Sequence, residues 1–246
     1  MKRRSDLLAI ALLAVLPFLF FWPVVFGGRT LIPADNLLAW EPWRSAAPAG
    51  TSLTPHNELL SDLVLENYAW KLFLRHCLAE GELPLWNPLI FTGVPFLAAG
   101  QHSALYPFSV LFYVLPLSQA YGIFSALQLS LAAVGMYVFA RAIGARVGAA
   151  FVAGATYAFS AFMVVSVGFT MMIAAAAWLP WCLLALEMLL RRTTEPGAGL
   201  RAGVPWLVAG AAFLGLQILA GHVEITYYVL LVMGLYTAWR LAQFDT

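Results

Sequence analysis

The chain has 246 residues, of which 62% are hydrophobic and only 10% charged, and its formal net charge is +1. A soluble domain normally carries about 25% charged residues, so this composition excludes an ordinary soluble protein. The near-neutral charge gives no basis for binding nucleic acid. Apolar runs long enough to cross a membrane recur along the chain, and the alternating strands of a barrel are missing. We predict an all-α polytopic membrane protein, with residues 1–246 forming a single membrane domain.

The N-terminus predicts a signal anchor that stays attached. Lys2, Arg3 and Arg4 resemble the basic start of a signal peptide. The apolar run at 7–26 is longer than a typical signal-peptide core, and no small-residue cleavage site follows it. We therefore expect residues 7–26 to be the first membrane span.

The region 119–240 predicts five further spans, which makes about six in all. We place them at 119–140, 147–167, 169–190, 203–221 and 223–239. Lys and Arg concentrate in short cytoplasmic loops, and a cytoplasmic N-terminus puts nine of the 13 basic residues inside. Counting the short, proline-bounded segment 105–117 as a span would reverse this distribution, so we expect it to be interfacial or re-entrant.

These spans leave a large first extracytoplasmic loop at 27–118. Its part at 27–104 holds seven of the 12 acidic residues and three of the four histidines, and the fourth, His222, falls on the same side of the membrane. Two explanations stay open at this point. Polar residues avoid lipid in any case, or this face of the protein carries chemistry.

Within the loop, residues 57–80 predict an amphipathic helix ending before Gly81. Glu58, Asp62 and Glu66 are four residues apart, so they form one stripe on such a helix. The stripe is either the solvated face of the helix or a cluster of carboxylates. Close carboxylates raise one another's pKa or hold a cation.

The following stretch, "GELPLWNPLIFTGVPFLAAGQHSALYP", runs from 81 to 107. Its four prolines favour a stiff, non-helical path. Trp86 and Tyr106 suit a membrane interface, and Asn87 and Gln101 supply neutral hydrogen-bonding groups. The backbone N–H and C=O groups of a non-helical segment near lipid must form hydrogen bonds with protein groups or with water. The stretch therefore either covers a wet cavity at the top of the bundle or forms a rigid interfacial hairpin without chemistry.

Few ionisable residues fall inside the predicted spans. Glu187 lies four residues before Arg191 and is expected to pair with it. His222 and Glu224 interrupt two apolar runs, so they form either a candidate site or a polar turn. The small residues of "VGAAFVAGATYAFSAF" predict close helix packing. We find no Walker loop, GxSxG, HExxH or CxxC motif, and Cys182 lies in an apolar run, which argues against a disulfide framework.

Three stretches resemble a known family: "DLVLENYAW", "GELPLWNPLIFTGVPFLAAGQHSALYP" and "AGHVEITYY". They resemble the bacterial YfhO-like membrane proteins, which are similar to the GT-C class of integral membrane glycosyltransferases. Asp35, just after the first span, and Asp62 match acidic positions of that family. Glu66 and Ala69, or their neighbours in a shifted register, stand where the family has glutamine and proline. Family members are longer, so we expect this chain to be the N-terminal part of a longer protein.

The resemblance implies a multi-pass protein of the bacterial inner membrane that moves a sugar from a polyprenyl-phosphate donor to a glycan, lipid or protein acceptor outside the cytoplasm. It implies that Asp35 or Asp62 is the catalytic base or a ligand for a divalent cation, Mg²⁺ or Mn²⁺. Trp86 and Tyr106 would stack on the sugar or the prenyl chain. The other expected substrate-binding residues are Glu66, Asn87, Gln101, His102, His222 and Glu224. A flippase for a lipid-linked saccharide and a non-catalytic assembly subunit are the alternatives.

Overall fold

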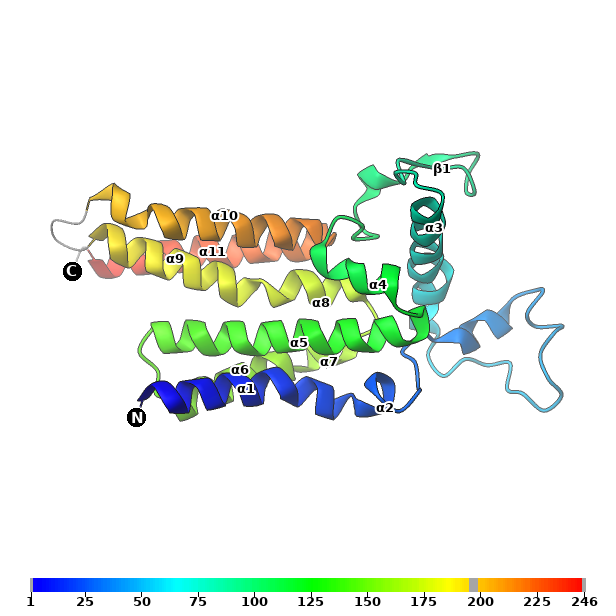
Figure 1. Ribbon diagram of the computed structural model, residues 1–246, viewed down its shortest axis with the longest axis horizontal. Coiled ribbons are helices and arrows are strands. Elements are labelled where there is room, and N and C mark those ends of the chain that lie inside the picture. The colour runs from blue at the N-terminus through cyan, green and yellow to red at the C-terminus, as the bar shows by residue number, and fades with distance from the viewer. Residues whose placement is uncertain (1, 195–198, 245–246) are drawn as a thin grey trace.

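The computed structural model of the protein describes residues 2–194 and 199–244. Long helices lie side by side along one axis and alternate in direction, and both ends of the described chain lie at the same end of this bundle (Figure 1). We call that end the terminal end and the opposite one the loop end. The helices along the axis are α1 (Lys2–Phe20), α5 (Leu117–Ala142), α6 (Val147–Ala158), α7 (Ala161–Val165), α8 (Thr170–Ala177), α9 (Leu179–Thr194), α10 (Val204–Leu219) and α11 (Val223–Phe244).

Among the described residues, five helical segments are long and apolar enough to cross a membrane, which confirms the prediction of an all-α membrane protein. They are Leu117–Ala142, Val147–Val165, Thr170–Thr194, Arg201–Leu219 and Val223–Gln243. The expected first span is not among them, because α1 begins with a charged segment that includes Arg4 and Asp6. Helix α1 nevertheless runs beside α5, and the Ser130 hydroxyl donates to the Ala14 carbonyl at 2.7 Å.

Three of the predicted spans contain breaks. The first ends at Phe20 and resumes as the short helix α2 (Trp22–Val25), with Pro23 in its first turn. The span starting at Val147 is interrupted at Ser160, whose hydroxyl accepts the Met163 N–H and begins α7. Helix α9 has Pro180 in its first turn, directly after the break at Trp178. Proline lacks the N–H that would continue a helix, which explains the first and third breaks.

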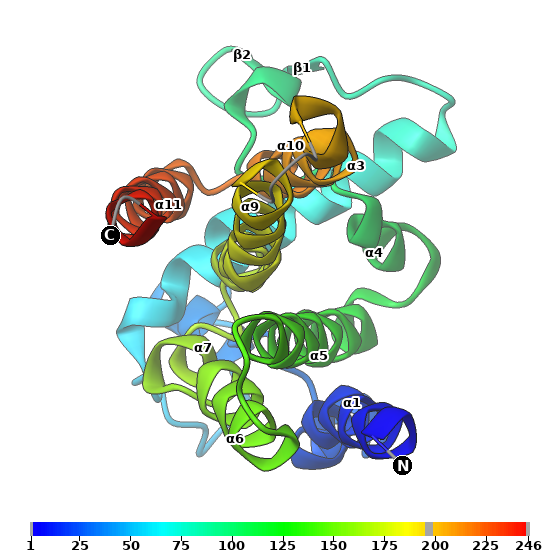
Figure 2. The ribbon, with the colours of Figure 1, turned by 90° about the vertical axis from the view of Figure 1, so that its left-hand side faces the viewer.

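Close packing around α5 forms the centre of the bundle (Figure 2). Helix α6 approaches α5 so tightly that a Cβ at Gly154 would lie 2.6 Å from the Ala133 carbonyl oxygen. The Gly/Ala-rich run thus permits the close packing that its small residues predict. On the other side, the Trp181 indole N–H donates to the Leu131 carbonyl at 3.0 Å.

Ion pairs tie the helices together at the terminal end. Arg141 Nε lies 2.7 Å from Asp6 Oδ1, joining α5 to α1. The predicted pair of Glu187 and Arg191 is confirmed, with Nε 2.5 Å from Oε1. The Glu187 carboxylate is fully buried and also binds Arg240 of α11.

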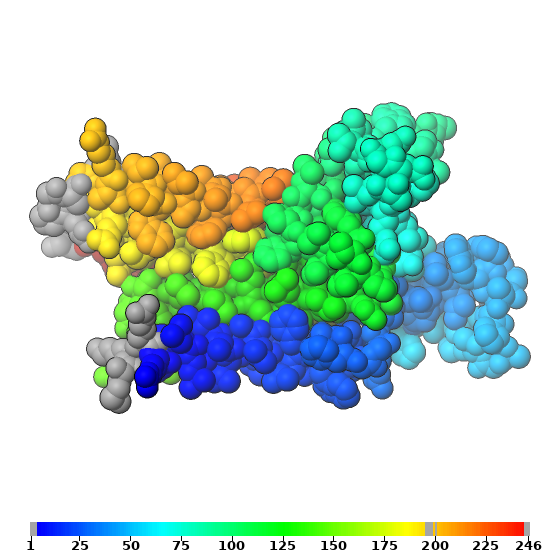
Figure 3. All heavy atoms as spheres, in the orientation of Figure 1, coloured from blue at the N-terminus to red at the C-terminus, as the bar shows by residue number. Residues whose placement is uncertain are grey.

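The loop end is built from short elements around one crosswise helix. Helix α3 (Tyr68–Ala79) runs across the ends of the bundle helices, and the segment 40–55 projects away from them (Figures 1 and 3). The expected helix 57–80 is divided: a 3₁₀ turn, η2 (Glu58–Leu60), and a π turn, η3 (Leu63–Asn67), precede α3. The segment 105–117 forms η5 (Pro107–Ser109) and the five-residue helix α4 (Val110–Val114). The other elements are η1 (Ala34–Ala39), β1 (Trp86–Asn87), β2 (Val94–Pro95), η4 (Leu97–Ala99) and η6 (Leu200–Gly203).

Candidate functional site

A polar cavity of about 240 Å³ lies at the loop end, between the segment before α3 and the helix connections of the bundle. It brings together four of the residues expected to form the site, from three separate parts of the chain: Asp62, Glu66, Gln101 and His222. We call it the polar pocket. Its remaining lining residues are Leu63, Asn67, Trp70, Phe169, Met171 and Met172.

The two carboxylates of the polar pocket come from the irregular helical segment before α3. Asp62 directly precedes the π turn η3, and Glu66 lies within it. The third residue of the predicted acidic stripe, Glu58, lies apart from them. It lines a different cavity of about 370 Å³ with Asn36 and Trp40. The expected stripe of three carboxylates is thus a pair in one cavity and a single carboxylate in another.

Asn67 fixes this segment to the bundle, and sequence reasoning did not single it out. Its side chain is buried, and its Oδ1 accepts a hydrogen bond from the Tyr121 hydroxyl of α5 at 2.7 Å. Its amide nitrogen lies 3.7 Å from the sulfur of Met171. A buried amide needs such partners, so Asn67 holds η3, with Glu66, in a fixed position beside α5.

His222 caps the first turn of α11 at the opposite wall of the pocket. Its Nδ1 accepts the Ile225 N–H at 3.3 Å. Partial burial lowers the pKa of His222, against a smaller opposing effect of Glu224. The imidazole is therefore neutral at pH 7 and carries its proton on Nε2, which makes it a hydrogen-bond donor. Glu224 is exposed and does not line the pocket.

Two glycines set the distance between His222 and Gln101. Gly221 and Gly100 both have positive φ angles, of 90° and 74°, a region that glycine adopts without a steric penalty. A Cβ at Gly221 would collide with the Gly100 carbonyl oxygen. The Ser103 hydroxyl adds a hydrogen bond of 2.6 Å to the Ala220 carbonyl, so the 100–103 turn is held against the α10–α11 connection.

Asp35 lies outside the polar pocket. It sits on η1, where its Oδ2 accepts the backbone N–H of His56 at 2.8 Å and lies 3.1 Å from the His56 Nδ1. The backbone hydrogen bond from His56 is the main cause that lowers the Asp35 pKa. The geometry gives Asp35 a role in holding η1 to the segment that precedes Glu58.

His102 and Tyr106 are buried in the protein and make internal hydrogen bonds. His102 Nε2 lies 2.8 Å from the Phe96 carbonyl, and its Nδ1 accepts the Ala104 N–H at 3.0 Å. The Tyr106 hydroxyl donates to Gln128 Oε1 at 2.8 Å and accepts the indole N–H of Trp178 at 3.0 Å. Neither side chain lines the polar pocket.

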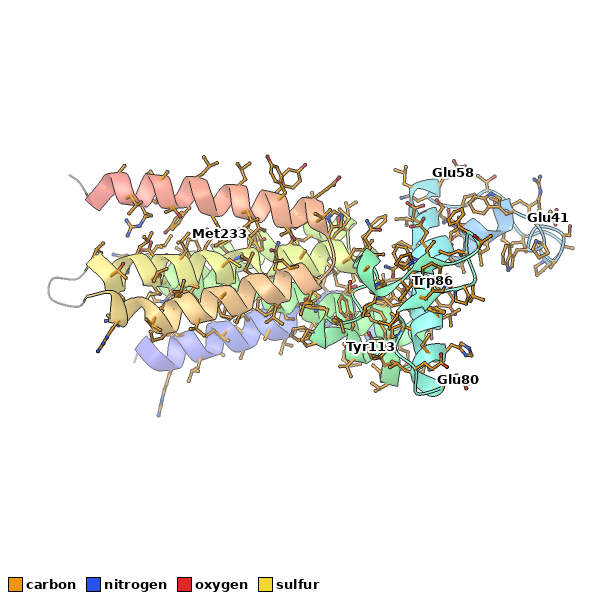
Figure 4. The ribbon with its side chains drawn as sticks, turned by 90° about the horizontal axis from the view of Figure 1, so that it is seen from above. Glu41, Glu58, Glu80, Trp86, Tyr113 and Met233 are labelled. Atoms are coloured by element: carbon orange, nitrogen blue, oxygen red, sulfur yellow. The ribbon has the colours of Figure 1, made fainter. Side chains whose placement is uncertain are left out.

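Trp86 and Asn87 form β1, which roofs a second cavity of about 430 Å³. Figure 4 shows Trp86 over α3, between Glu58 and Glu80. We call this the hairpin cavity, and Asn87 is one of the residues that line it. Glu66 and Trp70 line both the hairpin cavity and the polar pocket. The Asn87 Oδ1 accepts the Leu89 N–H at 2.9 Å, so the amide shapes the turn.

Lys71 is a further buried group that sequence reasoning did not single out as part of a site. Its side chain is fully buried, and its Nζ donates to the His102 carbonyl at 2.5 Å. The ammonium lies 4.5 Å from the centre of the Phe112 ring, a cation–π contact. Burial lowers the pKa of Lys71 to about 7.

A cation bound at Asp62 remains a prediction. Within residues 2–194 and 199–244, no three His, Cys, Asp or Glu side chains group together as a metal site. Mg²⁺ commonly takes one or two carboxylates and completes its shell with water and substrate phosphates. Asp62 shares the polar pocket with Glu66, whereas Asp35, the other expected ligand, does not line it.

The fold and the pocket define an all-α membrane protein with a polar site at one end of its helix bundle. The apolar helices contact lipid, as their composition requires. The chain matches no protein-family model, no curated protein and no solved structure.

Proposed function

We propose that the protein is an integral membrane glycosyltransferase that takes a sugar from a polyprenyl-phosphate donor and passes it to an acceptor outside the cytoplasm. The observation that carries the proposal is the meeting of Asp62, Glu66, Gln101 and His222 in one pocket at the loop end of the bundle. Carboxylates and neutral donors in one cavity at the level of the membrane surface fit a sugar phosphate better than they fit a purely apolar ligand.

The proposed orientation puts the loop end outside the cytoplasm, in the bacterial inner membrane. The arginines at helix ends support it: α5 ends near Arg141, α9 ends near Arg191 and Arg192, and α11 ends near Arg240. All of these helix ends lie at the terminal end (Figure 1). Cytoplasmic ends of spans carry the excess of Lys and Arg.

An apolar cavity of about 310 Å³ supports a lipid-linked donor. It lies among α6–α7, α8–α9 and α11, and Tyr157, Met163 and Val229 are among the residues that line it. Ile225 also lines it, one turn along α11 from His222. A phosphate at His222 would thus have space for an alkyl chain directly below it.

The proposed reaction is a displacement at the anomeric carbon of the sugar. Asp62 or Glu66 takes the proton of an acceptor hydroxyl, whose oxygen forms the new glycosidic bond. The bond between the anomeric carbon and the phosphate oxygen breaks, and its electron pair stays on the lipid phosphate. His222 Nε2–H donates to that phosphate as its charge increases. The acceptor is a glycan, a lipid or a protein of the cell envelope.

Sugar transfer by the full chain in lipid vesicles tests the proposal. We would supply radiolabelled polyprenyl-phosphate sugars and compare the wild type with Asp62→Asn and Glu66→Gln. Whichever of the two substitutions removes the catalytic base should lower the rate of sugar transfer at least about 100-fold. Glu58→Gln is the matched control, because Glu58 lies on the same segment but lines another cavity, and it should keep wild-type turnover.

Three outcomes would contradict part or all of the proposal. Unchanged transfer in both Asp62→Asn and Glu66→Gln would place the chemistry elsewhere. Movement of the labelled lipid across the bilayer without transfer would favour a flippase, and neither transfer nor movement would favour an assembly subunit.

A further inference from the structure

The polar pocket and the hairpin cavity adjoin each other, and two side chains, Glu66 and Trp70, line both of them. These two residues are four positions apart, which places them on one face of the helical segment that runs from η3 into α3. Asp62 and His222 line only the polar pocket. A molecule in the hairpin cavity can therefore contact the Glu66 carboxylate without entering the polar pocket.

The hairpin cavity differs from the polar pocket in its chemistry. Its volume of about 430 Å³ lies within the range of about 300–1,000 Å³ that is typical of small-molecule sites. Glu66 and Asn87 supply polar groups, and the Asn87 Oδ1 already accepts a backbone N–H. Three of the side chains that line the cavity are aromatic: Trp70, Phe73 and Phe91. A carboxylate beside aromatic rings fits a ligand that carries hydroxyl groups on an apolar frame.

The hairpin that covers this cavity has a strained turn of defined shape. Phe91, Thr92 and Gly93 have φ angles of 49°, 62° and 111°. Non-glycine residues rarely adopt such angles, and they persist only where the surroundings compensate the cost. The Trp86 ring lies against Gly93 so closely that a Cβ there would collide with it. The turn thus holds Phe91 at the edge of the cavity, where its side chain is 87% exposed.

The position and the charge of the cavity indicate which ligands it can take. The hairpin lies over α3, past the ends of α10 and α11 (Figures 1 and 4). The cavity is therefore beyond the ends of these candidate spans, where water and not acyl chains surrounds the protein. Among the described residues that line it, Glu66 alone is charged. The cavity thus offers no cation to a phosphate or a carboxylate, and it favours a neutral ligand that arrives from water.

We propose that the hairpin cavity binds a neutral saccharide, and that this saccharide is the acceptor of the sugar transfer proposed above, on which the inference rests. The C–H groups on one face of a sugar ring carry a slight positive charge, and the face of an aromatic ring is negative. Trp70 supplies such a ring, and Glu66 beside it accepts a hydrogen bond from a sugar hydroxyl. The cavity thereby selects a glycan acceptor over a lipid or a protein.

The shared position assigns the catalytic base to Glu66 and not to Asp62. With the phosphate of the donor at His222, the donor sugar lies in the polar pocket and the acceptor lies across Glu66 from it. Glu66 takes the proton of the acceptor hydroxyl, whose oxygen bonds to the anomeric carbon. The bond from that carbon to the phosphate oxygen breaks, and its electron pair stays on the phosphate. Glu66 then releases its proton to water, while Asp62 contacts the donor.

Photolabelling tests the saccharide site without requiring sugar transfer. The full chain in lipid vesicles would be irradiated with p-azidophenyl β-glycosides of glucose, galactose and N-acetylglucosamine, and labelled peptides would be identified by mass spectrometry. We expect labels in the segments 65–73 and 87–94. Trp70→Ala should reduce them about tenfold, because it removes the aromatic ring under the sugar. Trp43→Ala is the matched control, because Trp43 is an exposed tryptophan on the segment that projects away from the bundle.

Transfer kinetics test the acceptor role, with the same glycosides used as acceptors in the dark. Phe91 lines the hairpin cavity but not the polar pocket. Phe91→Ala should therefore raise the KM for the acceptor several-fold and leave the KM for the donor unchanged. Glu66→Gln should lower kcat at least about 100-fold, whereas Asp62→Asn should mainly raise the KM for the donor.

Failure of this inference can be distinguished from failure of the proposed function. Sugar transfer with an unchanged acceptor KM in both Trp70→Ala and Phe91→Ala would overturn the inference and leave the transferase in place. Labels found only outside the two expected segments would do the same. Loss of kcat in Asp62→Asn with full kcat in Glu66→Gln would overturn the assignment of the base. Labels in the hairpin cavity of a protein that transfers no sugar would reject the proposed function and leave a saccharide-binding site.

Discussion

The guanidinium of Arg240 contacts both carboxylate oxygens of Glu187, with Nε 2.8 Å from Oε2 and Nη2 2.9 Å from Oε1. The Tyr236 hydroxyl donates to the same carboxylate at 2.8 Å. These contacts join α9 to α11, a helix that has few buried residues of its own. A bidentate pair on a fully buried carboxylate is a strong and directional contact, so it anchors the end of α11.

The first prediction concerns this contact. Glu187→Ala leaves Arg240 partly buried without its carboxylate, and breaking a buried pair in this way costs about 3 kcal/mol. We expect the free energy of unfolding in mixed micelles to fall by about that amount. Glu224→Ala removes an exposed carboxylate and should change stability little. Equal stability of the two variants would show that the Glu187 contacts do not hold α11.

The second prediction concerns the contact of α6 with α5. Gly154→Ala would place a Cβ 2.6 Å from the Ala133 carbonyl oxygen, a backbone atom that cannot move aside alone. Overpacking of this kind costs about 1–3 kcal/mol. Gly148→Ala is a control in the same helix, because nothing lies within 4 Å of the added Cβ. Thermal unfolding should show a lower Tm for Gly154→Ala only, and an unchanged Tm would mean that the helices separate freely.

The third prediction is a pH dependence caused by Lys71. The pKa of this lysine is lowered from 10.5 to about 7 by burial, so between these values the unfolded chain binds more protons than the folded protein does. The free energy of unfolding therefore rises with pH in this window, by up to about 1.4 kcal/mol per pH unit. Lys71→Met should remove this slope in unfolding measurements made across the window. An identical slope in both proteins would assign it to other groups.

The fourth prediction concerns the glycine contact at the polar pocket. Gly221→Ala puts a Cβ against the Gly100 carbonyl at a φ of 90°, which costs about 1–3 kcal/mol in backbone strain. We expect faster hydrogen exchange in peptides covering 97–104 and 219–225, because the two turns separate. Gly215→Ala, where the added Cβ meets open space, should exchange like the wild type.

Most of the bundle could be predicted from the sequence alone. In lipid, the backbone N–H and C=O groups of a long apolar run must hydrogen-bond within the protein, and a membrane helix is the simplest way to achieve this. The pairing of Glu187 with Arg191 followed from their spacing of four residues. The division of the acidic stripe could not be predicted, because a π turn at Leu63–Asn67 has no clear sequence signal. The part that Arg240 plays in the Glu187 contact depends on helix packing across 53 residues of sequence.

Only part of the candidate site could be predicted, because sequence shows local patterns but not contacts between distant segments. Asp62 and Glu66 were visible as a local pattern, and His222 was visible as a polar interruption of apolar sequence. Their meeting in one cavity with Gln101 is a tertiary relationship. Asp35 shows the opposite case: its position in sequence suggested chemistry, whereas its hydrogen bonds to His56 assign it to the surface of the loop.

The carboxylates and the histidine of the polar pocket are held by different helices of the bundle. The segment that carries Asp62 and Glu66 is fixed to α5 by the hydrogen bond between Asn67 and Tyr121. His222 belongs to the connection between α10 and α11. The turn that carries Gln101 is held to this connection by the contact of Gly100 with Gly221, and to α3 by the hydrogen bond from Lys71 to the His102 carbonyl. A small tilt of the α10–α11 pair relative to α5 would therefore change the distance between the two carboxylates and His222. The width of the pocket is set by the angle between helices, and a bilayer that changes this angle would change the affinity for whatever the pocket holds.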